Sequence, residues 1–311
     1  MIHTDQANRG LAGTLFTGET PRCRERPTNT MEGRGADGKR GNRIVKAMKA
    51  AVALALMMTL AFAGAATAGP VLDRIQKKGE LVVGMSGDQP PLNVTTREGK
   101  IIGMEVDISS RLASDMGVTL RLATMPFAEL LPALSEGKID LILSGMTMTT
   151  KRNLKTAFAG PYYVTGKAFL TKQKTIASLK NADGIDAPEY IVTALKGSTS
   201  QMYVEKVLPK ARLVTAANYN EGLDLVLRDK AHVMVADYHF CAFAAFRYKE
   251  KGLTTVEAPF TFDPIGVAMP EGDPLLVNLV QNFLASLMGS GDLKKMTGHW
   301  FKDGSWVKEL P

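Results

Sequence analysis

The sequence predicts an α/β protein built on mostly parallel sheets. Short runs rich in apolar and β-branched residues alternate with longer helical stretches along most of the chain, and this alternation is typical of parallel sheets covered by helices. The composition is 45% hydrophobic, and neither an internal repeat nor a low-complexity tract follows residue 68. The chain is therefore long and apolar enough to bury a substantial core.

Strands are predicted where apolar runs are short and bounded by turn residues. They are expected at Glu80–Gly84, Val118–Ala123, Asp140–Leu143, Lys167–Thr171, Tyr190–Leu195, Ala211–Thr215, His232–Ala236 and Ile265–Met269. Helices are expected between them at Glu105–Met116, Phe127–Ser135, Thr199–Val207, Glu221–Arg228, Tyr238–Lys249 and Pro274–Met288. The last helix has the clearest signals, because Asp273 can cap its N-terminus and Gly289 follows its predicted end.

The first 68 residues read as a leader. Ala50 to Ala63 is an apolar run that follows four basic residues and precedes Ala66-Thr67-Ala68, which is the layout of a cleavable secretory signal. A membrane-spanning helix needs about 20 apolar residues, so an anchor is less well supported. We predict a signal peptide at residues 48–68, cleavage after Ala68 and export to the periplasm. Residues 1–47 are expected to be a disordered extension or the product of a start codon placed too early.

Removal of this leader changes the charge balance of the chain. The remaining 243 residues carry 28 Lys and Arg against 26 Asp and Glu, so nucleic-acid binding has no charge support. Cys23 lies in the leader and Cys241 is then the single cysteine, which we expect to be a buried thiol. The G-x-G-x-x-G pattern at residues 33–38 follows no strand and opens no helix, so we expect no nucleotide cofactor.

The segment from Ser144 to Arg152 follows a predicted strand and carries several polar side chains. Lys151 and Arg152 fall in the first turn of a short predicted helix, where the helix dipole disfavours cations. This arrangement predicts an anion near them, and the planar fork of Arg152 suits a carboxylate. The alternatives are a solvated arginine and, for Ser144 and Thr147, hydroxyls that only bond their own turn. We expect Lys151 to stay in solvent.

Asp237 closes the apolar run that begins at His232 and could hold a cation. It could equally be the N-cap of the helix that follows. One group that holds an anion and one that holds a cation together suit a small zwitterion, and an α-amino acid is the obvious candidate. His239 is expected on a helix surface. H-E-x-x-H, paired-cysteine and G-x-S-x-G motifs are absent after residue 68, so we expect neither a metal site nor an enzyme.

From Gly79 to about Trp300 the chain resembles family 3 of the bacterial extracellular solute-binding proteins, the periplasmic receptors of polar amino acid ABC importers. The motifs that carry the resemblance occur in order along the chain. They are Glu80-Leu-Val-Val-Gly84, Gly103-Met-Glu-Val-Asp107, Leu130-Leu-Pro-Ala-Leu134, Gly137-Lys-Ile-Asp140, Ser144 to Arg152, Phe158-Ala-Gly-Pro-Tyr-Tyr163, Leu195-Lys-Gly-Ser-Thr199, Val235-Ala-Asp237 and Ile265-Gly-Val-Ala268.

The resemblance implies a two-lobed periplasmic-binding-protein fold of type II, in which two sheets flanked by helices are joined by two crossing strands. Lobe 1 would comprise residues 69–168 and 268–311, and lobe 2 residues 171–262, with crossings at about 166–172 and 264–270. The expected function is to capture a polar amino acid between the lobes, without a cofactor, and to deliver it to an ABC permease in the inner membrane. We expect a monomer.

The same resemblance implies the ligand contacts. Arg152 would hold the carboxylate and Asp237 the ammonium group, with further contacts from Ser144, Gly145, Thr147, Ser198 and Thr199. The chain departs from the common pattern in the first loop, where Gln89 and Leu92 replace the expected aromatic residues. Gln89 is retained as a candidate contact, and Phe127 would supply the apolar wall instead.

Two other functions are kept as alternatives. One is an enzyme on the same scaffold that resembles the periplasmic cyclohexadienyl or arogenate dehydratases. Such an enzyme needs a general acid in the cleft, for which Glu129 or Glu221 is the candidate. The other is the sensory ectodomain of a receptor kinase, which is less well supported because no second apolar segment precedes Pro311.

Overall fold

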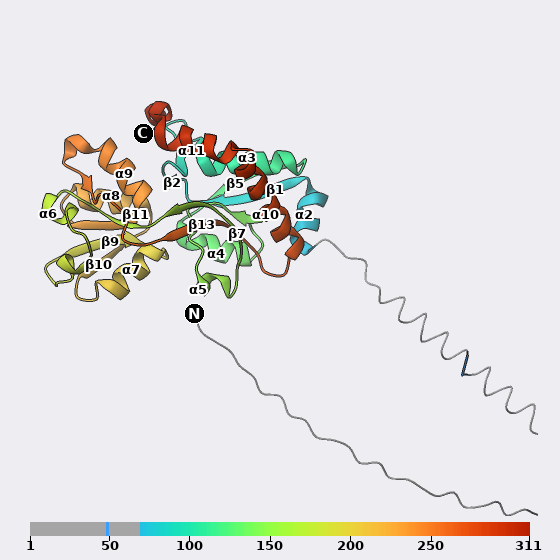
Figure 1. The fold of residues 1–311 in the computed structure, drawn as a ribbon, viewed down its shortest axis with the longest axis horizontal. Helices are drawn as coiled ribbons and strands as arrows, with labels where there is room; N and C mark the ends of the chain where they lie inside the picture. The colour runs from blue at the N-terminus through green and yellow to red at the C-terminus, as the bar shows by residue number, and fades with distance from the viewer. Residues whose placement is uncertain (1–47, 50–68) are drawn as a thin grey trace, which may run out of the picture. The chain divides into compact units, whose positions relative to one another are not determined.

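The computed structural model describes residues 48–49 and 69–311 (Figure 1). The predicted extension and nearly all of the predicted signal peptide therefore lie outside the described residues. The described residues 69–311 belong to one compact unit. Within the described residues, no helix has the length and apolarity needed to cross a membrane.

The first large sheet has the strand order β5-β1-β6-β13-β7. Its strands are β1 (Glu80–Met85), β5 (Thr119–Thr124), β6 (Leu141–Ile142), β7 (Ala157–Thr165) and β13 (Asp263–Met269). β1 pairs in parallel with β5 and β6, whereas β13 runs antiparallel to β6 and β7. This sheet and the helices packed on it are called lobe 1.

The second large sheet has the order β10-β9-β11-β8-β12. Its strands are β8 (Lys167–Thr171), β9 (Ile191–Leu195), β10 (Arg212–Ala216), β11 (Val233–Asp237) and β12 (Thr254–Thr255). β9 is parallel to β10 and β11, and β8 is antiparallel to β11 and β12. This sheet and its helices are called lobe 2. The predicted α/β fold with two sheets is confirmed. Each sheet is mixed, because the strand with which the chain enters it from the other lobe, β8 in lobe 2 and β13 in lobe 1, runs antiparallel to its neighbours.

The remaining elements cover these sheets or extend lobe 1. A small antiparallel sheet in lobe 1 joins β2 (Asp88–Gln89), β3 (Asn93–Thr95) and β4 (Ile101–Ile102). The helices are α2 (Pro70–Lys78), α3 (Met104–Asp115), α4 (Phe127–Ser135), α5 (Thr150–Asn153), α6 (Lys174–Ala177), α7 (Thr199–Val207), α8 (Tyr219–Leu227), α9 (Tyr238–Arg247), α10 (Pro274–Gly289) and α11 (Asp292–Lys302). In the view of Figure 1, α8 and α9 lie on one side of the lobe 2 sheet and α7 lies on the other.

The chain changes sheet twice. β7 ends at Thr165 in lobe 1, and β8 begins at Lys167 in lobe 2. The return occurs between β12, which ends at Thr255, and β13, which begins at Asp263. Asp263 pairs with Thr165 in the ladder between β13 and β7, so the two crossings meet at one edge of lobe 1.

The apolar pattern of β1 explains how lobe 1 is layered. Successive side chains of a strand point to opposite faces. Leu81, Val83 and Met85 pack into the core formed with α2, α3 and α10, whereas Val82 packs on the side of α4. Both faces of the sheet are therefore covered, as expected for the parallel part of an α/β sheet.

Asp273 caps two helices at once. As predicted, it is the N-cap of α10, and its Oδ1 accepts a hydrogen bond from the N–H of Leu276 at 3.0 Å. Its Oδ2 accepts from the N–H groups of Val71 and Leu72 at 3.0 and 2.9 Å, in the first turn of α2. The side chain is buried, so this one carboxylate accepts hydrogen bonds from N–H groups that water could not reach.

Cys241 lies on α9 and is fully buried, as the sequence predicted. It is a free thiol, and its Sγ lies 3.8 Å from the carbonyl oxygen of Ala168 on β8. Burial raises the pKa of this thiol well above its ordinary value. Cys241 is therefore protonated and inert at neutral pH.

Candidate functional site

Arg152 is a buried cation at the junction of the lobes. It lies on α5, and the backbone N–H donates to Thr149 Oγ1 at 3.2 Å, which fixes the short helix. Nη1 donates to the carbonyl oxygen of Thr147 at 2.8 Å, and Nη2 donates to that of Gly197 in lobe 2 at 3.3 Å. The guanidinium carbon lies 5.8 Å from the centre of the Phe127 ring.

The charge of Arg152 is not neutralised by the rest of the described chain. No carboxylate there forms an ion pair with it, although a guanidinium has five N–H donors and only two are used. Burial lowers the pKa of Arg152 to about 10, and the nearby Asp237 opposes this shift. The side chain therefore stays protonated at pH 7 and keeps donors for an anion.

Ser144 and Gly145 are engaged within lobe 1. Ser144 Oγ accepts from the N–H of Ser86 at 2.9 Å, and the N–H of Gly145 donates to Glu105 Oε1 at 2.7 Å. Gly145 has φ +58°, and a Cβ built there would lie 2.3 Å from Gln89 Oε1. Glycine is therefore required both by the backbone conformation and by the approach of the Gln89 side chain.

Glu105 holds the loops of lobe 1 in place, a role that no sequence motif predicted. It is fully buried and accepts from Gly145 N–H, from the hydroxyl of Tyr162 and from Asn93 Nδ2. Asn93 Oδ1 in turn accepts from the N–H of Gly87 at 2.6 Å. Burial raises the pKa of Glu105, and the three donors oppose this shift. The signal was an acidic residue on a helical face that otherwise carries apolar residues and one serine.

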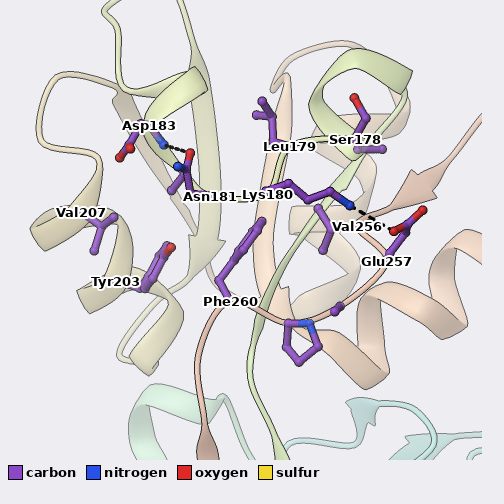
Figure 2. A pocket seen from close by; sticks show the side chains of 14 residues that line it. Ser178, Leu179, Lys180, Asn181, Asp183, Tyr203, Val207, Val256, Glu257 and Phe260 are labelled. Carbon is purple, nitrogen blue, oxygen red and sulfur yellow. Dashed lines mark hydrogen bonds and ion pairs between the residues drawn. The ribbon is translucent and has the colours of Figure 1, made fainter.

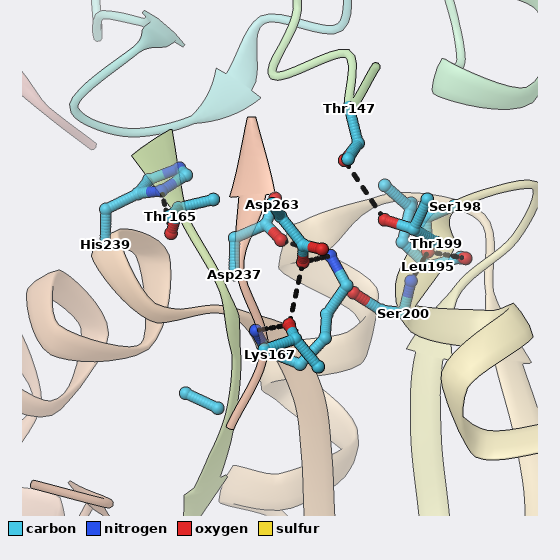
Figure 3. A network of polar contacts seen from close by, with 12 residues as sticks. Thr147, Thr165, Lys167, Leu195, Ser198, Thr199, Ser200, Asp237, His239 and Asp263 are labelled. Carbon is cyan, nitrogen blue, oxygen red and sulfur yellow. Dashed lines mark hydrogen bonds and ion pairs between the residues drawn. The ribbon is translucent and has the colours of Figure 1, made fainter. Parts of the chain in front are cut away.

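Ser198 and Thr199 lie at the start of α7 in lobe 2. Ser198 is the N-cap, and its Oγ accepts from the N–H groups of Ser200 and Gln201 at 3.1 and 3.2 Å. The same hydroxyl donates to the carbonyl oxygen of Leu195 at 2.7 Å. Thr199 Oγ1 lies 3.1 Å from Thr147 Oγ1 (Figure 3), so these two hydroxyls bridge the lobes.

Asp237 belongs to a group of three charges in which Asp237 and Lys167 are buried and Asp263 is partly buried (Figure 3). Lys167 Nζ lies 2.5 Å from Asp237 Oδ1 and 2.9 Å from Asp263 Oδ2. Burial lowers the pKa of Lys167, but the two carboxylates outweigh this effect and raise it. Asp237 occupies the N-cap position of α9 without making a capping hydrogen bond, because its carboxylate turns toward Lys167. The role of Lys167 was not predicted, because the sequence of its strand indicates only a short buried strand.

Gln89 fills the space beside Asp237. Its Nε2 donates to Tyr219 Oη at 3.0 Å and to Asp237 Oδ2 at 3.3 Å, and it lies 3.4 Å from His239 Nε2. Its Oε1 is buried without a hydrogen-bond partner among the described residues. Leu92, the other unusual residue of this loop, is fully buried in the core of lobe 1 and does not belong to the site.

The prediction that His239 lies on a helix surface is wrong. Its side chain turns inward from the first turn of α9, and only 4% of the residue is exposed. Nδ1 lies 3.2 Å from Thr165 Oγ1. Burial lowers the pKa of His239 to about 4, with opposition from Asp237, so the ring is neutral at pH 7.

Asp88 connects the first loop of lobe 1 to lobe 2. Its Oδ2 accepts from the N–H of Tyr219 at 2.6 Å, in the first turn of α8, where the helix dipole favours an anion. Its Oδ1 is buried without a partner among the described residues. Burial raises the pKa of this carboxyl.

The two candidate acids of the enzyme hypothesis lie in solvent. Glu129 and Glu221 are both exposed, and Glu221 Oε2 accepts from the N–H of Ala217 at 2.7 Å.

A cavity of about 560 Å³ lies in lobe 2 (Figure 2). It is lined by residues 177–183 and 256–260 together with Tyr203 and Val207, none of which is a predicted site residue.

Comparison with known proteins identifies a family. Residues 81–303 match the family described as bacterial extracellular solute-binding proteins, family 3. The chain is 29% identical over 230 residues to the L-arginine-binding protein of Pseudomonas aeruginosa, which covers 70% of this chain and 86% of that protein. It is 26% identical over 250 residues to the cyclohexadienyl dehydratase of the same species, which covers 80% and 93%.

Solved structures give the same result. An ancestral amino acid-binding protein described as a precursor of cyclohexadienyl dehydratase is 32% identical, with a TM-score of 0.68 over 74% of this chain and 99% of that one. A binding component of an ABC transporter from Wolinella succinogenes, solved with lysine, is 30% identical, with a TM-score of 0.71 over 74% and 99%. The predicted relationship and the two-lobed fold are confirmed.

Proposed function

Because the chain belongs to family 3 of the bacterial extracellular solute-binding proteins, we propose that it captures a polar α-amino acid between its lobes and delivers it to an ABC permease. Relatives described as binding arginine, cystine, glutamine and histidine support an amino acid as ligand. The proposal includes export to the periplasm and a monomeric receptor.

The charge pattern between the lobes carries this proposal. Arg152 provides one positive charge without a paired carboxylate in the described chain. Lys167 provides one positive charge against the two negative charges of Asp237 and Asp263, so that group has one negative charge in excess. An α-amino acid carries one carboxylate, which compensates the positive charge of Arg152, and one ammonium group, which compensates the excess negative charge of Asp237 and Asp263.

Closure of the lobes would supply the affinity. Contacts of Arg152 with Gly197 and of Thr147 with Thr199 join the lobes only when these are close together. A ligand that touches both lobes binds the closed form better and shifts the population toward it. We propose the crossings around residue 166 and before Asp263 as the hinge.

A thermal-shift screen of the twenty amino acids on a chain that begins at residue 69 tests the proposal. Ligand at 100 times its dissociation constant adds about 2.7 kcal/mol to the free energy of unfolding. One or a few amino acids should raise the melting temperature, and calorimetry should give saturable binding with one site. A flat screen, repeated after unfolding and refolding to remove any co-purified ligand, contradicts the proposal.

A second candidate function is a cyclohexadienyl dehydratase-like enzyme. The match to the Pseudomonas aeruginosa dehydratase over most of both chains favours it. The reaction needs a group that protonates the leaving hydroxyl, and the exposed positions of Glu129 and Glu221 do not supply one in this conformation. Incubation with prephenate or arogenate, followed by chromatography for the aromatic product, decides between the two functions.

A further inference from the structure

The nitrogen of the Gln89 side chain has three polar neighbours that come from lobe 2. Asp237 Oδ2, Tyr219 Oη and His239 Nε2 lie 3.3, 3.0 and 3.4 Å from it. All three side chains belong to buried residues, with at most 4% of any of them exposed. They approach from the end of β11 and from the first turns of α8 and α9.

Each of these atoms can accept a hydrogen bond. A carboxylate oxygen only accepts, and a phenol oxygen can accept as well as donate. His239 is neutral, and when its Nδ1 carries the proton toward Thr165 Oγ1, its Nε2 is an acceptor. The carboxylate also explains the orientation of Gln89, because only the nitrogen of its amide can donate to Asp237.

A carboxamide is an incomplete occupant of this position. Its nitrogen has two hydrogens, whereas three acceptors surround it, and its oxygen is left buried without a donor. A primary ammonium has three hydrogens and one positive charge. The positive charge also matches the excess negative charge of Asp237 and Asp263 over Lys167.

We propose that Asp237, Tyr219 and His239 form a three-acceptor site for a primary ammonium group, and that the Gln89 side chain occupies this site when no ligand is bound. The inference rests on the proposed function, since an α-amino acid supplies the ammonium. It adds Tyr219 and His239 as ligand contacts and makes Gln89 an internal competitor. The ligand enters when Gln89 swings away from Gly145.

Two substitutions separate the competitor from the site. Gln89→Ala removes the competing amide. L-arginine and L-glutamine, tested by calorimetry, should therefore bind this variant about three- to tenfold more tightly than they bind the unchanged protein, as expected for the loss of one or two competing hydrogen bonds.

Tyr219→Phe, added to Gln89→Ala, removes one acceptor while the ring stays packed against the ring of Phe240, at a centroid distance of 4.4 Å. The double variant should bind about tenfold more weakly than Gln89→Ala alone. Gln173→Ala and Tyr203→Phe, which lie outside the site, serve as matched controls and should change nothing.

A second measurement does not depend on amino acid binding. In ¹⁵N NMR spectra of Gln89→Ala, methylammonium should shift the imidazole nitrogens of His239, and tetramethylammonium, which has no N–H donor, should not. Such a shift without any amino acid binding supports the ammonium site and refutes the proposed function. Tight amino acid binding that Tyr219→Phe leaves unchanged refutes the site and leaves the function intact. Weaker binding by Gln89→Ala overturns the role of Gln89 as competitor.

Discussion

Lys167 Nζ lies 2.5 Å from Asp237 Oδ1, so the residue proposed to receive the ligand ammonium is already bonded to the first residue of a crossing strand. The same lysine reaches Asp263 on the other crossing strand at 2.9 Å. The proposed ligand site and both crossings therefore share one ionic group. A change in the charge next to Asp237 should therefore alter the electrostatic interactions of both crossing strands through Lys167.

Replacement of Lys167 by Met should destabilise the protein strongly. It leaves the carboxylates of Asp237 and Asp263 close together without their cation, and breaking a buried pair in this way costs about 3–5 kcal/mol. Urea unfolding measures the loss. Lys180→Met removes the exposed pair with Glu257 and is the control, for which little change is expected. Equal stability of the two variants contradicts the role given to Lys167.

Arg152→Lys should abolish most of the ligand affinity while the fold persists. Lysine keeps the charge but loses the planar fork that can hold a carboxylate with two hydrogen bonds. A loss of about 2–5 kcal/mol in binding free energy is expected, measured by calorimetry with the best amino acid from the screen. Its neighbour Lys151 is exposed, and Lys151→Ala should bind as the unchanged protein does.

Stability should fall in mild acid because of His239. The unfolded chain protonates this histidine below about pH 6.5, whereas the pKa of about 4 in the folded state keeps it neutral. The unfolded state then binds more protons between these values, so the free energy of unfolding decreases as pH falls through this window, by on the order of 3 kcal/mol in total.

The raised pKa values of Asp88 and Glu105 act in the opposite direction, since the folded state binds their protons more readily. His239→Gln isolates the histidine term because the other groups are common to both proteins. Urea unfolding at pH 7, 6 and 5 should show a smaller decrease for this variant. Parallel curves for the two proteins speak against a buried neutral histidine.

Asp88→Ala should weaken the closed form. It removes the acceptor for the N–H of Tyr219 and the negative charge at the start of α8. The expected loss in ligand affinity is about 1–2 kcal/mol, and it should occur as faster dissociation in stopped-flow experiments, because closure and not encounter is affected. Asp115→Ala, which removes a surface pair with Arg111, is the control.

Asp273→Ala should cost more stability than an ordinary helix cap. A single N-cap contributes about 1 kcal/mol, and this carboxylate also satisfies two donors of α2. We expect the free energy of unfolding to fall by about 3 kcal/mol, in part because the buried N–H groups of α2 lose their acceptor. Asn218→Ala, at the N-cap of α8, is a matched single cap. Equal losses in both variants contradict the double role.

Sequence patterns predicted well those elements whose local signals agree with their packing. The strand Lys167–Thr171 and the helices Phe127–Ser135 and Thr199–Val207 occur with the predicted bounds. β7 was missed because Gly160 and Pro161 interrupt an otherwise apolar and aromatic run. The second set of donors on Asp273 was also missed, because Val71 and Asp273 are distant in sequence and meet only through tertiary packing.

The site was predictable only where a charge was locally out of place. Arg152 stood out because cations are unusual in a first helical turn. Lys167 begins a strand whose next three residues are apolar, and its partners come from two distant strands, so no short pattern reveals the group. Gln89 was noticed as a departure from the family, but its contact with Tyr219 depends on how the lobes meet.

The inert thiol of Cys241 makes this protein suitable for labelling at a single introduced cysteine. In a chain that begins at residue 69, the only thiol is that of Cys241, which is buried and protonated and would therefore not react with a maleimide dye. Lys196 is exposed and adjoins Gly197, whose carbonyl contacts Arg152 across the lobes. A fluorophore attached through Lys196→Cys would therefore report the proposed ligand capture as a change in emission, without labelling of Cys241.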